Sequence, residues 1–489
     1  MRTALHADWI IGFENGDHVL HRDADIVYED DRILHVGRRW QGETDRRIEL
    51  GAALISPGFI DLDALADIDH ALLDSWADPT LRDGHQWSED YFNTPRRDVF
   101  TPEERRFIRT YAMAQLALHG VTTLMPIASE VHSSWAETFE DAVGIAEAAS
   151  HLGLRSYAGP SFRSGVNVVR STGRRDVLWD HERGREGLAD ARRFLDHAAD
   201  SANPLVHGAL LPCRIETMSL DLMSATAQLA RAYDVPVRIH CMQGTGELEL
   251  LRQWYDATPL QLLERTGLLE CRLFVPHALF GSDAENGRRP TDQELGKLAD
   301  ADVTVVHCPL TSLRYGTALR SFDRYRAAGV NVALGTDSYP PDLIKGMDVG
   351  GNIAKLVEGR LDAGGAADYF RSATLNAAGA LGRDDLGRLM PGAQADLVVL
   401  DLSDFRLGVV DDPLRSLLMS GSARDVRMTV VAGRTVADQG TLPGLDLVAM
   451  KAEAQELFDR MRSAYTERDL HRRTPNRLFP PTFRMAGEA

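Results

Sequence analysis

The sequence predicts an α/β fold made of a large parallel sheet wrapped by helices and a smaller β-sandwich built from both ends of the chain. Two observations support this fold class. Apolar strand-like runs alternate with helical stretches through the middle of the chain, which is typical of a parallel sheet covered by helices. Strand-like runs without intervening helices occupy both ends, which favours a separate small domain where the two ends meet.

The two chain ends carry the pattern of short strands separated by turns. Acidic residues or glycine bound each run, as is usual between strands. The runs cover residues 9–13, 24–28 and 32–37 near the N-terminus, and 395–401 and 426–436 near the C-terminus. The N-terminal runs are too short to bury a core of their own, so we expect residues 1–56 and 391–444 to pair into one β-sandwich domain.

Residues 57–390 are expected to form the large domain, and several of its strand-like runs end in a polar residue. The runs cover residues 121–125, 235–240, 273–277, 303–307 and 330–337. Three of them end in His240, His277 and Asp337. Barrels of alternating strands and helices build their active sites from residues at the strand C-termini. We therefore expect these three side chains to converge on one site.

Residues 445–489 follow the strand-like runs of the C-terminal part of the chain and are expected to form a C-terminal helix and a tail. Apolar residues recur there at helical spacing between Leu447 and Tyr465, and a stretch rich in proline and arginine follows. A helix that packs on the large domain, with a tail crossing its surface or a neighbouring subunit, is the interpretation that this pattern favours.

Composition limits the classes of partner. The formal net charge of -18 argues against binding to nucleic acid, which favours basic proteins, so a small molecule is the expected partner. Cys213, Cys241, Cys271 and Cys308 are widely spaced, which indicates neither a disulfide framework nor a thiolate zinc site. No apolar run approaches the 18 or so residues of a membrane span. We expect a cytoplasmic protein that does not enter membranes.

A series of short motifs carries a family resemblance that extends over nearly the whole chain. They are PGFID at residues 57–61, GVTT at 120–123, HCPLTS at 307–312, LGTDS at 334–338, ATLNAA at 373–378 and PGAQADL at 391–397. In this order and spacing they resemble the amidohydrolase superfamily, in the branch of cytosine, guanine and adenosine-derivative deaminases and s-triazine hydrolases. The resemblance implies a (β/α)₈ TIM-like barrel for residues 57–390, a small-molecule substrate and a homodimer.

The resemblance also implies a metal site, from which this sequence departs at two places. In the family, His-x-His ends the first strand, the fifth and sixth strands each supply a histidine, and the eighth supplies an aspartate. Here the His-x-His positions hold Asp63 and Leu65. A glutamate often follows the fifth-strand histidine by three residues, and here that residue is Gln243, whose amide can hydrogen-bond but cannot deliver a proton.

These positions give the expected site. Asp337 is the expected general base, His240 a ligand or polarising group, and His277 a partner to the oxyanion or leaving group. Asp63, His240 and Asp337 could hold one divalent ion, zinc or iron, because carboxylate and imidazole are both zinc ligands. A metal-free pocket in which Asp63 only forms hydrogen bonds stays open as the alternative. Gln243, Asp63 and Ser338 are the expected contacts to the substrate.

Other residues near the first strand leave alternatives open. A shifted metal ligand could come from residues beyond that strand, and the candidates are Asp67, Asp69, His70 and His85. An inserted loop could wall a flat ring, or form a local core, with Trp76, Trp87, Tyr91 and Phe92. Cys241 and Cys308 are expected to be packing thiols rather than nucleophiles. Thr101 is expected to cap a helix that begins at Pro102.

Three function hypotheses follow. The leading one is a hydrolase or deaminase that acts on a C–N or related bond of a small nitrogen-rich compound, expected to be cyclic, with Asp337 as the base. The second keeps the barrel but is a metal-independent lyase, isomerase or transferase that uses the same acid and base groups. The third is a catalytically silent small-molecule binding protein. A barrel fold by itself does not choose among them.

Overall fold

The structure is a computed structural model, which describes residues 1–68, 87–93, 98–127, 135–282 and 289–486. Both chain ends contribute to one eight-stranded sheet, as predicted. Its central path runs β21-β20-β19-β5-β1-β2-β3, and β4 pairs with β1. The strands are β1 (Arg2–Glu14), β2 (Asp17–Glu29), β3 (Arg32–Gly37), β4 (Arg46–Glu49), β5 (Ala53–Pro57), β19 (Leu397–Asp401), β20 (Val426–Val431) and β21 (Arg434–Asp438).

The first two strands of this sheet are longer than predicted, and the last predicted run is two strands. The first two strands are 13 residues each, because they pair continuously from Arg2 opposite Glu29 to Glu14 opposite Asp17. Polar residues along this hairpin face solvent, so the apolar runs mark only part of it. The predicted run at 426–436 is a hairpin, since Ala432 and Gly433 turn the chain with positive φ angles of 47° and 74°.

The central part of the chain forms a closed barrel of parallel strands, which confirms the predicted α/β fold class. Two four-stranded sheets, β13-β9-β8-β6 and β15-β16-β17-β18, meet where Leu210 bridges Val237. They meet again where the backbone N–H of Asp337 donates to the carbonyl oxygen of Asp63, 2.6 Å away. The strands are β6 (Phe59–Ala64), β8 (Val121–Pro126), β9 (Arg155–Ala158), β13 (Val206–Gly208), β15 (Val237–Arg238), β16 (Leu273–Pro276), β17 (Thr304–His307) and β18 (Asn331–Leu334).

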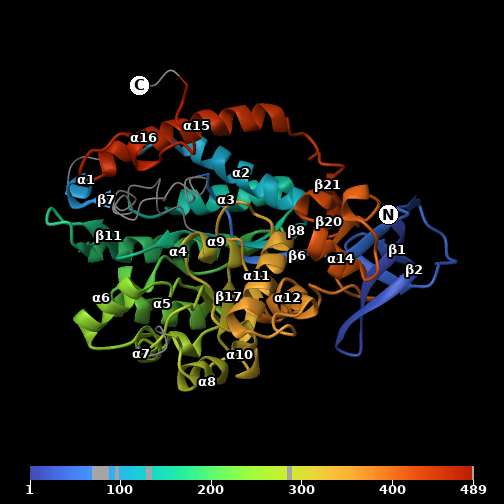
Figure 1. Ribbon diagram of the computed structural model, residues 1–489, viewed down its shortest axis with the longest axis horizontal. Helices are drawn as coiled ribbons and strands as arrows, with labels where there is room; N and C mark the ends of the chain where they lie inside the picture. Colours follow the sequence, from blue (N-terminus) through green and yellow to red (C-terminus); the bar gives the residue numbers. More distant parts are fainter. Residues whose placement is uncertain (69–86, 94–97, 128–134, 283–288, 487–489) are drawn as a thin grey trace.

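Helices surround this barrel (Figure 1). The first of them, α2, begins as predicted: Thr101 and Glu104 form a reciprocal capping box with Pro102 in the first turn. None of the helices in the described ranges is long and apolar enough to cross a membrane. The helices are α2 (Pro102–Leu118), α3 (Phe139–Leu152), α4 (His181–Asp200), α5 (Leu220–Tyr233), α6 (Thr245–Tyr255), α7 (Pro259–Arg265), α8 (Asp292–Asp300), α9 (Pro309–Arg314), α10 (Phe322–Ala327), α11 (Leu343–Glu358), α12 (Ala366–Ser372), α13 (Leu375–Ala380) and α14 (Pro413–Ser420).

The C-terminal segment packs on its own chain. Helix α15 (Leu447–Arg468) lies along α2 and is followed by the short helix α16 (Pro475–Leu478) (Figure 1). The buried guanidinium of Arg468 lies 4.3 Å from the centre of the Trp87 ring and near Tyr91 and Tyr465. Trp87 and Tyr91 therefore belong to a local core, one of the two roles that the sequence left open. Trp76 lies outside the described residues.

A histidine between the two domains provides a pH-dependent test of the fold. His18 of β2 is partly buried, and its Nε2 lies 3.0 Å from the Thr374 hydroxyl. Burial lowers the pKa of His18 to about 4. In the unfolded chain His18 binds a proton near pH 6.5, whereas in the folded chain it does so only near pH 4. The free energy of unfolding therefore decreases as the pH falls through this window.

We expect His18→Gln to remove part of this acid sensitivity. Between pH 7 and pH 5 the free energy of unfolding of the wild type should fall by roughly 2 kcal/mol more than that of the variant. Urea unfolding at the two pH values measures the difference. An equal pH dependence in both proteins would contradict the burial of a neutral His18.

Candidate active site

Four buried side chains meet at the C-terminal ends of the barrel strands: Asp63, His240, His277 and Asp337. One potential ligand atom of each lies within 4.8 Å of the others. Asp63 lies on β6, and the other three follow β15, β16 and β18. The structure thus brings together the four residues that the sequence placed at the strand ends.

The contact between the first and eighth strands depends on a glycine. A Cβ atom on Gly335 would lie 2.7 Å from the Cβ of Asp63 and 3.1 Å from its backbone nitrogen, which is too close for any other residue. Asp61 reinforces the contact, because its carboxylate accepts hydrogen bonds from the backbone N–H and the hydroxyl of Thr336 at 3.1 and 2.6 Å. This close packing holds Asp337 beside Asp63.

The imidazole of His240 has a defined orientation. Its Nδ1 lies 2.9 Å from the carbonyl oxygen of Cys213, so Nδ1 carries a hydrogen and donates it. Its Nε2 faces the Oδ2 of Asp63 at 3.6 Å. In the neutral ring the lone pair of this nitrogen faces a carboxylate, and the two repel each other. A proton on Nε2, a metal ion or a water molecule that donates to both atoms relieves this repulsion.

The carboxylate of Asp63 lies close to the side chains of Arg238 and His240. Arg238, two residues before His240 on β15, is 1% exposed and places its Nη1 3.3 Å from the Oδ1 of Asp63. The same Nη1 donates to the carbonyl oxygen of Met125 at 3.0 Å. Burial by itself raises the pKa of Asp63, but the charges of His240 and Arg238 outweigh it and hold the pKa well below its ordinary value. Asp63 is therefore an ionised carboxylate.

The imidazole of His277 is neutral. Burial, with the neighbouring charge of His240, lowers its pKa well below the ordinary value. Its Nε2 lies 3.9 Å from the Oδ2 of Asp337 and forms no hydrogen bond within the described chain. A buried ring nitrogen of this kind is available to a substrate, to water or to a metal.

The residues present fit a divalent cation. Two carboxylates and two imidazoles converge, and their oxygen and nitrogen donors suit zinc and iron. The Nε2 of His277 is buried without a hydrogen-bond partner in the described structure, so a bound ion would satisfy a polar atom that is otherwise costly to bury.

Polar residues that were not predicted from the sequence surround Gln243. Arg214 donates a hydrogen bond to the Oε1 of Gln243. Glu247 accepts from the backbone N–H groups of Met242 and Gln243 at 2.7 and 3.0 Å. Burial and the nearby carboxylate of Glu216 raise the pKa of Glu247 to about 8. Gln243 is therefore held at both its backbone and its side chain.

The remaining candidates have structural partners or lie outside the described ranges. The Ser338 hydroxyl contacts that of Thr311, and Cys241 is fully buried in the core between the barrel and its helices, as expected of a packing thiol. Cys308 lies 3.6 Å from Asp63, and burial raises the pKa of its thiol well above the ordinary value. Asp69, His70 and His85 lie outside the described residues.

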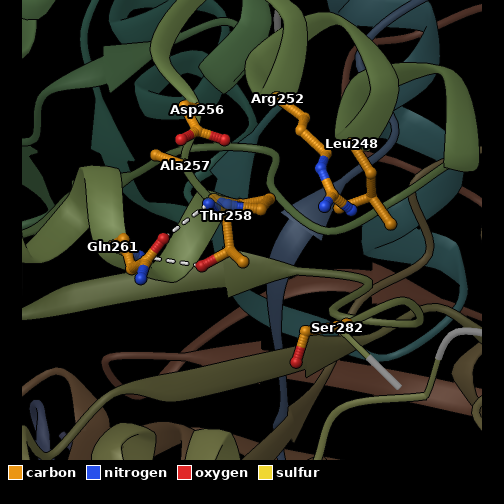
Figure 2. Close-up of a pocket in the computed structure, with 9 residues that line it drawn as sticks. Leu248, Arg252, Asp256, Ala257, Thr258, Gln261 and Ser282 are labelled. Atoms are coloured by element: carbon orange, nitrogen blue, oxygen red, sulfur yellow. Dashed lines mark hydrogen bonds between the residues drawn. The ribbon is translucent and has the colours of Figure 1, made fainter. Parts of the chain in front are cut away.

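A pocket of about 340 Å³ lies between α6, α7 and the turn at Gly281 and Ser282. Figure 2 shows Arg252 and Thr258 at its wall and the two hydrogen bonds that join Thr258 to Gln261 in the cap of α7. None of the described residues that line this pocket belongs to the four-residue cluster. It is therefore distinct from the cluster at the barrel mouth.

Comparison with known proteins identifies the family of this chain. The profile of the amidohydrolase family matches residues 54–436, most of the chain. The chain belongs to the amidohydrolase family. This confirms the predicted resemblance and the predicted class of hydrolase, and it accounts for the barrel whose strand ends carry Asp63, His240, His277 and Asp337.

Individual amidohydrolases resemble the chain over nearly their full length. It is 26% identical over 429 residues to 5-methylthioadenosine/S-adenosylhomocysteine deaminase of Pyrococcus furiosus, covering 87% of this chain and 93% of that protein. It is 25% identical to the 8-oxoguanine deaminase of Pseudomonas aeruginosa, covering 87% and 92%. The crystal structure of a Xanthomonas campestris adenosine deaminase with bound zinc superposes with a TM-score of 0.77 at 24% identity, covering 94% and 98%.

Proposed function

We propose that this amidohydrolase hydrolyses the bond between a ring carbon and an exocyclic nitrogen of a nitrogen heterocycle. The observation that carries the proposal is the buried cluster of Asp63, His240, His277 and Asp337 at the barrel mouth. Relatives that act as deaminases of 5-methylthioadenosine, S-adenosylhomocysteine and 8-oxoguanine support the same reaction class for this chain.

Asp337 and His277 have separate roles in the proposed reaction. The oxygen of water adds to the ring carbon while Asp337 accepts one proton of that water. The bond from carbon to the exocyclic nitrogen then breaks, and the departing nitrogen takes up a proton and leaves as ammonia or an amine. His277, which is neutral and has a free Nε2, would hydrogen-bond to the attacking water or to the leaving group. The ring keeps an oxygen where it carried nitrogen.

Asp63, His240 and Asp337 would hold one divalent ion, which we propose is zinc or iron. When bound, such an ion lowers the pKa of water towards 7 and so supplies hydroxide at neutral pH. The hydrogen bond from Nδ1 of His240 to Cys213 leaves Nε2 as the donor atom. The predicted homodimer and cytoplasmic location stay predictions.

The proposal is tested by measuring ammonia release from a panel of amino-substituted purines, purine nucleosides, pyrimidines and s-triazines. A coupled glutamate dehydrogenase assay measures the product, and incorporation of ¹⁸O from labelled water into the ring confirms hydrolysis. We expect one ring class to be turned over. Conversion of a substrate without uptake of water oxygen would instead support the lyase, isomerase or transferase hypothesis.

A further inference from the structure

We propose that Arg238 balances the charge of Asp63, so that a divalent ion at the barrel mouth is not fully neutralised by its two carboxylate ligands. This inference deepens the proposed function and rests on it, because that function places one ion at Asp63, His240 and Asp337. It follows from the buried ion pair between Arg238 and Asp63 and from the number of carboxylates in the cluster.

Strand register directs the side chain of Arg238 into the barrel. Arg238 lies opposite Phe274 of β16, and its backbone N–H donates to the carbonyl oxygen of Leu210 at 3.0 Å. His240 follows two residues later, so its side chain and that of Arg238 point to the same side, whereas Ile239 between them packs in the core between the barrel and its helices. The guanidinium of Arg238 therefore lies inside the barrel, close to the cluster.

The guanidinium of Arg238 has one acidic partner. Its Nη1 lies 3.3 Å from the Oδ1 of Asp63 and donates to the carbonyl oxygen of Met125 at 3.0 Å. No other carboxylate of the described chain forms an ion pair with Arg238, and its Nε is buried without a hydrogen-bond partner there. A neutral donor could satisfy the Met125 carbonyl equally well, whereas a buried charge is costly unless it is paired. The positive charge of Arg238 therefore acts mainly on Asp63.

The two oxygens of Asp63 have different neighbours. Oδ1 faces the guanidinium of Arg238. Oδ2 faces the Nε2 of His240 and the thiol of Cys308, each at 3.6 Å, which is too far for a strong hydrogen bond. Arg238 thus pairs with Asp63 through one oxygen and leaves the other for an ion. In this arrangement Arg238 is a positioning residue, because it acts through Asp63 and does not itself contact the substrate.

The charges of the cluster show what Arg238 changes. Imidazoles that bind a metal are neutral, so the ionised carboxylates of Asp63 and Asp337 would by themselves cancel the charge of a divalent ion. The guanidinium of Arg238 leaves the occupied site with one net positive charge. A metal ion activates water through its charge, so this remaining charge favours hydrolysis. Its cost is a weaker hold on the ion, because Arg238 and the ion repel each other.

A charge-balancing role and a purely structural role predict opposite effects on metal affinity. If Arg238 only held Asp63 in place, its removal would weaken zinc binding and slow turnover together. If Arg238 balances charge, a neutral residue in its place strengthens zinc binding and still slows turnover. The direction of the change in zinc affinity therefore separates the two roles without any measurement of activity.

The test measures zinc affinity by competition with a chromophoric chelator at about pH 8.5, where protons compete weakly with the ion. We expect Arg238→Gln and Arg238→Met to bind zinc at least about tenfold more tightly than the wild type. Arg238→Lys, which keeps the positive charge but not the planar shape, should stay within roughly threefold of the wild type. Two neutral variants are used so that one folded protein suffices.

A matched control uses a second buried ion pair. Arg155 of β9 lies 3.0 Å from Asp396, both side chains are buried, and neither belongs to the four-residue cluster. Arg155→Gln removes a buried guanidinium in the same way and should leave the dissociation constant for zinc unchanged. Thermal unfolding checks that each variant is folded.

The outcomes distinguish this inference from the proposed function. Unchanged or weaker zinc binding by a folded neutral variant, or binding by Arg238→Lys as tight as that of the neutral variants, would overturn the inference alone. A wild-type protein that does not bind zinc would overturn it together with the proposed ion. Tighter binding by the neutral variants, in proteins that turn over none of the heterocycles, would support the role of Arg238 and contradict the proposed reaction.

Turnover provides a second readout once a substrate is known. At saturating zinc we expect kcat of Arg238→Gln to be at least about tenfold lower than that of the wild type, although the variant binds the ion more tightly. A kcat equal to that of the wild type would contradict the inference that the charge of Arg238 serves the reaction.

Discussion

Replacement of Asp337 by asparagine is expected to lower kcat of the hydrolysis by roughly 10³-fold. Asparagine keeps the shape of the side chain, but its amide cannot take the proton of the attacking water. Asp337 also belongs to the group of four potential ligands, so the change weakens the site for an ion as well. Steady-state kinetics on the substrate identified from ammonia release measures the effect.

A matched control uses a carboxylate on the neighbouring helix. Asp348 of α11 lies outside the cluster and accepts a hydrogen bond from Asn352 on the same helix, 2.8 Å away. Asp348→Asn should keep kcat within about twofold, because surface substitutions away from a site have small effects. An Asp337→Asn protein with full turnover would contradict the assignment of Asp337 as the base.

The second large effect concerns the metal. We expect the purified protein to carry a divalent ion. We expect Asp63→Ala to lower the affinity of the protein for this ion by at least roughly 100-fold, because the variant loses the carboxylate that faces Nε2 of His240 at 3.6 Å. It also leaves Arg238 buried without the Asp63 carboxylate, which is costly in itself. Asp63→Asn, which keeps the size of the side chain, is the variant to use if Asp63→Ala does not fold.

Elemental analysis measures the bound ion before and after chelation, with zinc, iron and manganese added back in separate samples. Reversible loss of turnover with the ion would support the hydrolytic proposal. Full turnover by a protein shown to be free of metal would favour the metal-independent alternative. Retention of the ion by Asp63→Ala at wild-type affinity would exclude Asp63 as a ligand.

Sequence patterns located some elements better than others. The strand ends at His240, His277 and Asp337 could be predicted, because a polar residue after a buried apolar run is a local signal. The long hairpin of β1 and β2 could not, since its exposed half carries polar residues whose strand conformation depends on pairing. Arg214 was missed because the segment before it, at residues 210–213, was not identified as part of a barrel strand.

By itself, the sequence determined the family, the barrel and the four side chains that meet at its mouth. Only the tertiary structure decided that Arg238 lies against Asp63, that Cys213 orients the ring of His240, and that Arg214 turns the amide of Gln243. The physical reason is that alternation along a strand shows which way a side chain faces. Its neighbours across the barrel depend on strand register and closure, and the contact between β18 and β6 at Gly335 joins residues that are far apart in the chain.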